Sequence, residues 1–109
     1  MKRYKLSEPA EDDLDGIFAY LADRSKSTEA VDRLEASFQD FFELLAKWPG
    51  VGRRYHGKVE GLRCYPMGSY IIAYVEGSDG IEILHVMPGV RDISRILGDQ
   101  LDEEEPSLR

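Results

Sequence analysis

Residues 69–87 read SYIIAYVEGSDGIEILHVM, and this stretch decides the fold. Two runs rich in β-branched and aromatic residues, 69–76 and 81–87, flank the polar turn sequence GSDG at 77–80. That pattern predicts two antiparallel strands joined by a tight turn. A third run, LRCYP at 62–66, predicts another strand beside the first of them.

An amphipathic helix is predicted well upstream of these strands, at residues 8–23. Ser7 is a suitable N-cap, and Pro9 stands in the first turn, where proline is tolerated. The apolar side chains recur at helical spacing; they are Ala10, Leu14, Ile17, Phe18 and Leu21. Residues 2–6, KRYKL, predict a short edge strand before this helix.

A second amphipathic helix follows the polar link DRSKST. Ser27 or Thr28 can cap it, and the sequence KWPG at 47–50 ends it because a proline disfavours helix at the residue before it. The Phe-rich face of this helix and Trp48 could lie in the core or face a partner protein, and we expect the core. The predicted order is β-α-α-β-β-β, an α+β domain in which a helical hairpin packs on a small antiparallel sheet.

Charge is distributed unevenly along the 109 residues, whose formal net charge is −7. Residues 1–46 carry 6 basic and 11 acidic side chains, residues 47–97 carry 7 and 5, and residues 98–109 carry 1 and 5. We therefore expect one folded domain at 1–97 and an acidic C-terminal tail at 98–109. Overall acidity argues against non-specific binding to nucleic acid.

The sequence predicts neither a metal site nor a bound cofactor. Cys64 is the single cysteine, so no internal disulfide forms, and its place in a strand predicts a small core residue. His85 is expected on the open face of the sheet. The first residues contain no apolar signal segment, and no apolar run is long enough to span a bilayer. These features predict a cytoplasmic protein.

Five short motifs occur in order along the chain: Pro-Ala-x-x-Asp-Leu at 9–14, Pro-Gly-x-Gly-Arg at 49–53, Gly-Leu-Arg at 61–63, Tyr-x-x-x-Tyr at 70–74, and Arg-Asp at 91–92. This succession resembles the ParE-type toxins of the ParE/RelE superfamily, the plasmid-stabilising half of bacterial type II toxin–antitoxin operons. The resemblance covers about residues 3–97 and implies the same fold that the residues predict.

The resemblance implies a toxin that is wrapped by a ParD-like antitoxin in a hetero-oligomer and that inhibits DNA gyrase by binding it. On this interpretation no residue is catalytic. The candidate contacts for the target are Arg63, Tyr70, Tyr74, Arg91 and Asp92, with Asp92 orienting Arg91. A turn-closing ion pair at Arg91–Asp92, and core packing of the two tyrosines, are the alternatives. The antitoxin is expected on the exposed side of the helices and the sheet edges.

Two other functions remain open for this superfamily. One is a RelE-like, ribosome-dependent mRNA endonuclease in which Arg63 and Arg91 hold the phosphate; the other is a weakly toxic, antitoxin-bound co-repressor. RNA cleavage is disfavoured because the chain has no Tyr, His or Lys beyond Ile96 and ends in an acidic tail. Pro88 also stands where many relatives have a histidine.

Overall fold

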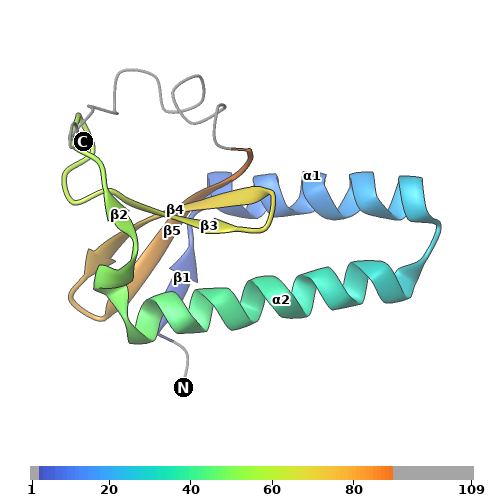
Figure 1. Ribbon diagram of the computed structural model, residues 1–109, viewed down its shortest axis with the longest axis horizontal. Helices are drawn as coiled ribbons and strands as arrows, with labels where there is room; N and C mark the ends of the chain where they lie inside the picture. Colours follow the sequence, from blue (N-terminus) through green and yellow to red (C-terminus); the bar gives the residue numbers. More distant parts are fainter. Residues whose placement is uncertain (1–2, 90–109) are drawn as a thin grey trace.

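The protein is an α+β domain, and the computed structural model describes residues 3–89 (Figure 1). Two long helices and a five-stranded sheet make up this part of the chain. The elements are β1 (Tyr4–Leu6), α1 (Glu8–Ser25), α2 (Thr28–Lys47), the 3-10 turn η1 (Pro49–Val51), β2 (Arg53–Arg54), β3 (Arg63–Met67), β4 (Tyr70–Gly77) and β5 (Gly80–Pro88). The Arg91–Asp92 pair and the predicted boundary between the domain and the tail, at residue 97, lie outside the described residues.

The sheet has the strand order β1-β5-β4-β3-β2. Tight turns make β3, β4 and β5 antiparallel neighbours, as predicted, and the two-residue β2 adds an unpredicted edge strand beside β3. The expectation of a wholly antiparallel sheet is wrong at β1, which pairs with β5 in parallel and aligns Tyr4 with Ile81. No tight turn joins these two strands, so the hairpin rule does not fix their direction.

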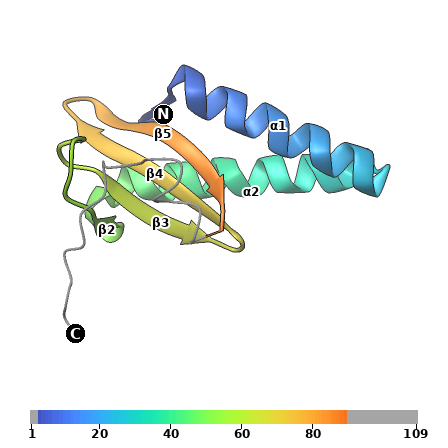
Figure 2. The ribbon, with the colours of Figure 1, turned by 90° about the horizontal axis from the view of Figure 1, so that it is seen from above.

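Side-chain caps set the start of both helices. The Ser7 hydroxyl accepts a hydrogen bond from the Ala10 amide at 3.1 Å, and Ser27 does the same for Ala30 at 3.1 Å. Of the two predicted caps of α2, Ser27 is therefore the one used. The helices form an antiparallel hairpin that extends past the sheet (Figure 2). No helix within residues 3–89 combines the length and apolar character needed to cross a membrane.

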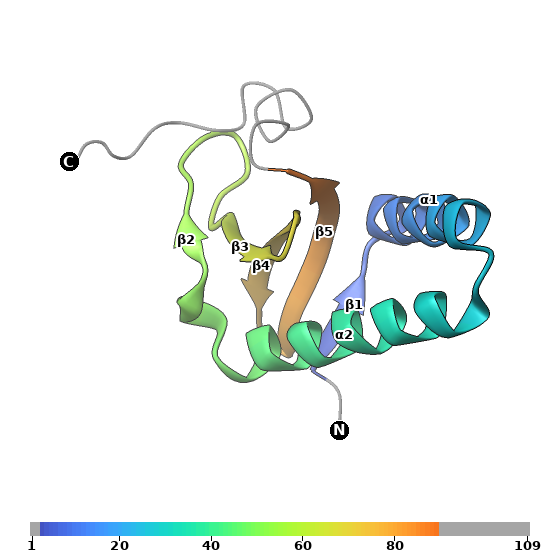
Figure 3. The ribbon, with the colours of Figure 1, turned by 45° about the vertical axis from the view of Figure 1, so that its right-hand side comes forward.

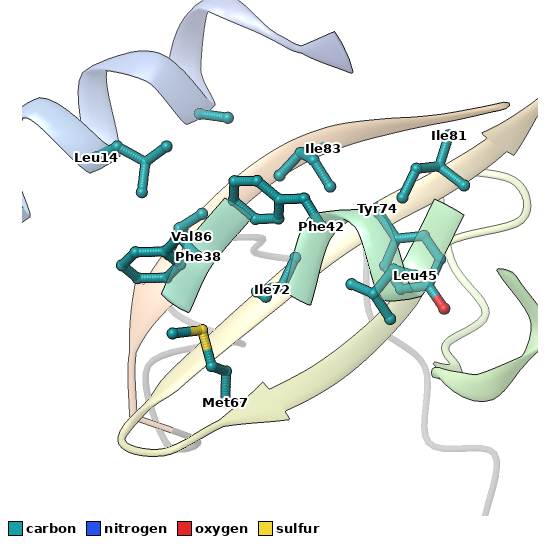
Figure 4. Close-up of a cluster of buried hydrophobic side chains, with 11 residues drawn as sticks. Leu14, Phe38, Phe42, Leu45, Met67, Ile72, Tyr74, Ile81, Ile83 and Val86 are labelled. Carbon is teal, nitrogen blue, oxygen red and sulfur yellow. The ribbon is translucent and has the colours of Figure 1, made fainter. Parts of the chain in front are cut away.

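The main core lies between the helical hairpin and one face of the sheet (Figure 3). Phe38 is its centre: its ring centroid lies 6.0 Å from Phe18, 5.9 Å from Phe42 and 5.4 Å from Tyr70. Figure 4 shows Leu14 of α1 and three side chains of α2 meeting residues from β3, β4 and β5. A smaller apolar cluster lies on the other face and contains Leu62, Cys64, Ile71, Ala73 and Met87.

Trp48 is not in the core, contrary to the sequence-based expectation. It is 60% exposed, whereas Phe38 and Phe42 of the same Phe-rich face are buried as expected. Trp48 is the C-cap of α2, and its φ of −127° is not helical. Because the chain leaves the helix here, the apolar face of α2 no longer determines which way this side chain points.

A β-bulge in β5 changes which residues face the helices. Ala73 pairs with His85, but Tyr74 pairs with Ile83, which leaves Leu84 as an extra residue. Strict alternation fails across this bulge. His85 pairs with Ala73, a member of the apolar cluster on the face away from the helices, which agrees with the predicted open face. Its Nδ1 nevertheless lies 3.0 Å from the Asp13 carboxylate on α1, a contact that the sequence did not predict.

Backbone groups around the bulge are satisfied by the start of α1. The Val86 amide donates to Asp13 Oδ2 at 2.9 Å. The Ser7 amide donates to the Ile83 carbonyl at 3.0 Å, and its hydroxyl donates to the Leu84 carbonyl at 3.0 Å. Ser7 therefore both caps α1 and hydrogen-bonds to β5, and Asp13 of α1 accepts a hydrogen bond from the backbone of β5.

Replacing Asp13 tests this arrangement. Asp13→Ala leaves the Val86 amide without its acceptor, and we expect a loss of about 1–2 kcal/mol in the free energy of unfolding. Urea denaturation measures it. Asp15→Ala removes an exposed carboxylate from the same helix and is expected to change stability by less than about 0.5 kcal/mol. Equal losses in the two variants would contradict the role given to Asp13.

Candidate functional site

Two of the predicted site residues, Arg63 and Tyr74, lie opposite each other on β3 and β4 and reach the same turn. The Tyr74 hydroxyl donates to the Pro49 carbonyl at 2.7 Å and accepts from the Gly52 amide at 2.9 Å. Arg63 Nη1 donates to the Gly52 carbonyl at 2.7 Å and to the Gly50 carbonyl at 3.3 Å. Together the two side chains fix η1 to the sheet.

Tyr74 supports this turn from inside the core. Its side chain has no exposed surface, and burial raises the pKa of its phenol, an effect that the Gly52 amide and the Arg63 charge oppose. The fit is close: a Cβ at Gly52 would lie 2.8 Å from Cε1 of the Tyr74 ring. In this structure Tyr74 offers no surface to a target, and it acts on the exposed surface by positioning η1.

Tyr70 lies apart from this pair, at the other end of β4. It packs on Phe38 and lines a groove of about 590 Å³ between α1 and the ends of β4 and β5. We call this the α1–sheet groove; its other lining residues are Asp12, Asp13, Gly16, Ile17, Tyr20, Val86 and Pro88. Arg91 and Asp92 lie outside the described residues, so three of the five predicted contacts can be placed.

A second groove, of about 330 Å³, runs between the two helices beside β1. We call it the interhelical groove; it is lined by Tyr4, Lys5, Leu6, Glu11, Leu14, Phe18, Glu35, Phe38, Gln39 and Phe42. Both grooves combine apolar walls with carboxylates. An amphipathic segment with basic residues would match that chemistry.

Three large apolar side chains, Leu44, Trp48 and Val51, form an exposed stripe that the sequence did not predict; they are 39%, 60% and 49% exposed. These residues are spaced i, i+4 and i+7 in the sequence, although the non-helical backbone of Trp48 separates α2 from η1. The same spacing usually marks a buried face, so the pattern alone pointed to the core. The signal that could have separated the cases is Pro49, which ends α2 before Val51.

Cys64 is a buried core residue, as predicted. Burial raises the pKa of its thiol from 9.0 to about 12, so it is protonated at neutral pH and a poor nucleophile. Within residues 3–89, no cluster of three or more His, Cys, Asp or Glu side chains is arranged to hold a metal ion.

The sequence matches that of a known protein family. The profile of the ParE toxin of type II toxin-antitoxin systems, parDE, matches residues 4–93. The chain belongs to the ParE toxin family. Toxin ParE1 of Caulobacter vibrioides is 33% identical over 87 residues, which cover 80% of this chain and 88% of that toxin. The chain is thus a ParE-type toxin of a type II toxin–antitoxin system.

A solved structure supports the fold. The chromosomal ParDE toxin–antitoxin system from P. aeruginosa contains a chain that aligns with a TM-score of 0.52 at 21% identity. The alignment covers 83% of the present chain and 98% of the solved one. The family resemblance inferred from the five motifs is confirmed by the family match over residues 4–93 and by the similarity to Toxin ParE1.

The Tyr74 hydroxyl gives a direct test of how η1 is held. Tyr74→Phe keeps the ring but leaves the Pro49 carbonyl and the Gly52 amide without their partner, and we expect it to cost about 1–3 kcal/mol of stability. Denaturant unfolding measures the loss. The control, Tyr20→Phe, removes a hydroxyl from a side chain that is 63% exposed and should be neutral. If both variants unfold like the wild type, the hydroxyl does not anchor the turn.

The Cys64 thiol should be protected in the native state. We expect a disulfide reagent at about pH 8 to modify it only after denaturant unfolds the chain, since the buried thiol is both inaccessible and protonated. The unfolded chain loses the thiol proton first, so this residue lowers stability as the pH rises from 9.0 toward about 12. Cys64→Ala should remove that part of the alkaline loss. Fast labelling of the folded protein would contradict the assignment.

Proposed function

We propose that this toxin acts by binding and inhibiting DNA gyrase, and that a ParD-like antitoxin neutralises it in a hetero-oligomer in the cytoplasm. Membership of the ParE toxin family, from the match over residues 4–93, is the observation that carries the proposal. Stabilisation of the plasmid or chromosomal region that encodes the pair is the biological role we propose.

The shape of the helical layer supports an antitoxin partner. The α1–sheet groove and the interhelical groove both lie along α1, and each combines apolar walls with carboxylates. A helix or extended segment of the antitoxin that carries apolar and basic residues would fill them. The sheet edge at β1 lies beside the interhelical groove, which gives such a segment backbone groups to pair with as well.

An inhibitory contact fits the described side chains better than RNA cleavage does. Arg63, a phosphate holder in the endonuclease alternative, has its Nη1 engaged by two carbonyl groups of the η1 turn. The chain carries a net charge of −7, which opposes approach to the RNA backbone. We keep Arg91, with Asp92, as the proposed target contact, while Arg63 and Tyr74 support the surface and Tyr70 lines the α1–sheet groove.

Supercoiling assays with purified gyrase test the proposal. The toxin is expected to block supercoiling in the assay and to induce the SOS response and filamentation in cells. An equal amount of its cognate antitoxin should abolish these effects. Arg91→Ala should weaken inhibition about tenfold or more, as for a charged interface contact. A rapid stop in translation with cleaved transcripts would instead support the endonuclease. A chain that binds antitoxin without arresting growth would support the co-repressor.

A further inference from the structure

The apolar stripe of Leu44, Trp48 and Val51 is unusual for the surface of a small soluble domain. It holds three of the four large apolar side chains that are exposed within residues 3–89; the fourth is Tyr20. Backbone hydrogen bonds link the three positions, because the Trp48 amide donates to the Leu44 carbonyl and the Val51 amide donates to the Trp48 carbonyl. Exposed large apolar side chains gathered in one short segment mark a candidate site of protein–protein contact.

The stripe is held rigidly from beneath. Tyr74 and Arg63 make four hydrogen bonds to the backbone of residues 49–52, the turn that carries Val51 and follows Trp48. Gly52 packs so closely on the Tyr74 ring that the turn cannot sink further into the sheet. A surface that is ordered before it binds loses less conformational entropy on binding. The stripe is therefore prepared for contact with a folded partner.

Basic residues lie near Trp48 along an otherwise acidic chain, whereas the exposed carboxylates Asp40 and Glu43 stand at the Leu44 end of the stripe. Lys47 Nζ lies 5.8 Å from the centre of the Trp48 ring, and Arg53 and Arg54 are exposed in β2, after η1. The α1–sheet groove contains Asp12 and Asp13, and the interhelical groove contains Glu11 and Glu35 beside Lys5. The Trp48 end of the stripe thus favours a partner surface with apolar and acidic groups, whereas the grooves favour apolar and basic groups.

Shape separates these surfaces further. The grooves are recesses that a chain segment can fill, whereas Trp48 projects from the molecule and needs a pocket on its partner. Leu44, Trp48 and Val51 share no residue with either groove. The stripe lies where α2 meets β2, at the opposite end of the helical hairpin from the α1–α2 turn (Figure 1). One small toxin thereby presents two surfaces of opposite character for two partners.

We infer that the stripe of Leu44, Trp48 and Val51 is the surface that contacts the inhibited target, where Trp48 enters an apolar pocket edged by carboxylates and Lys47 pairs with one of them. This inference rests on the proposed function, in which the toxin inhibits a protein and the antitoxin fills the grooves on α1. Large aromatic side chains at the centre of an interface usually carry most of its binding energy.

The test compares gyrase inhibition and antitoxin binding in the same set of variants. We expect Trp48→Ala to raise the toxin concentration for half-inhibition by about 30-fold or more, and Trp48→Phe to restore most of the loss. Lys47→Glu should raise it about tenfold, with a smaller effect at high salt. Antitoxin affinity, measured by calorimetry, should stay at the wild-type value in all three variants, which also reports that they fold.

Arg33→Glu is the matched control for Lys47→Glu. It makes the same charge change at an exposed position of α2, about 21 Å away along the helix, and is expected to inhibit like the wild type. Unchanged inhibition by Trp48→Ala would overturn the inference. So would a loss of antitoxin affinity in parallel with the loss of inhibition, because the stripe would then be an antitoxin surface.

The experiments distinguish an error in the proposed target, gyrase, from an error in the proposed binding surface, the stripe. If the wild-type toxin does not inhibit gyrase, the proposed function is wrong at that step, and growth arrest in cells replaces supercoiling as the readout. A Trp48→Ala toxin that still arrests growth overturns the inference. Loss of arrest with retained antitoxin binding supports it, provided that Arg33→Glu remains toxic.

Discussion

The outer edge of β5 is the constraint on which the rest of the fold depends. This strand lies between β1 and β4 in the sheet, and its backbone groups on the side away from β4 need partners along the whole edge. β1 supplies them as far as Ile83 by parallel pairing. Ser7 and Asp13 supply them beyond that point, through the Leu84 carbonyl and the Val86 amide. The start of α1 is thereby fixed to the sheet. The position of α1 in turn limits where α2 can pack.

Much of this architecture could be predicted because local signals agree with one another. The Ser7 and Ser27 caps, the helical spacing of apolar residues and the GSDG turn all act within a few residues, and the structure confirms each of them. The misses depend on contacts between distant residues. The parallel pairing of β1, the bulge at Leu84 and the contact between His85 and Asp13 have no local signature. The two-residue β2 is too short to produce a pattern.

The candidate site could be predicted only in part for a related reason. The family resemblance indicates Arg63 and Tyr74 as candidate contacts for the target. The structure places both side chains beneath the η1 turn. Trp48 was assigned to the core because its spacing matched the buried face of α2, although it is the most exposed residue of the stripe. Spacing identifies which residues share a face only while the helix continues, and the non-helical backbone of Trp48, with φ −127°, ends that relation.

The contact between Gly52 and Tyr74 also bears on how this family can change over time. The two positions are 22 residues apart, yet any side chain at 52 would overlap the ring at 74, and the hydroxyl at 74 holds the amide at 52. Neither position can accept a bulkier or a shorter residue alone without loss. Substitutions at positions 52 and 74 are therefore expected to occur together in descendants of this chain, so that the η1 turn and β4 coevolve.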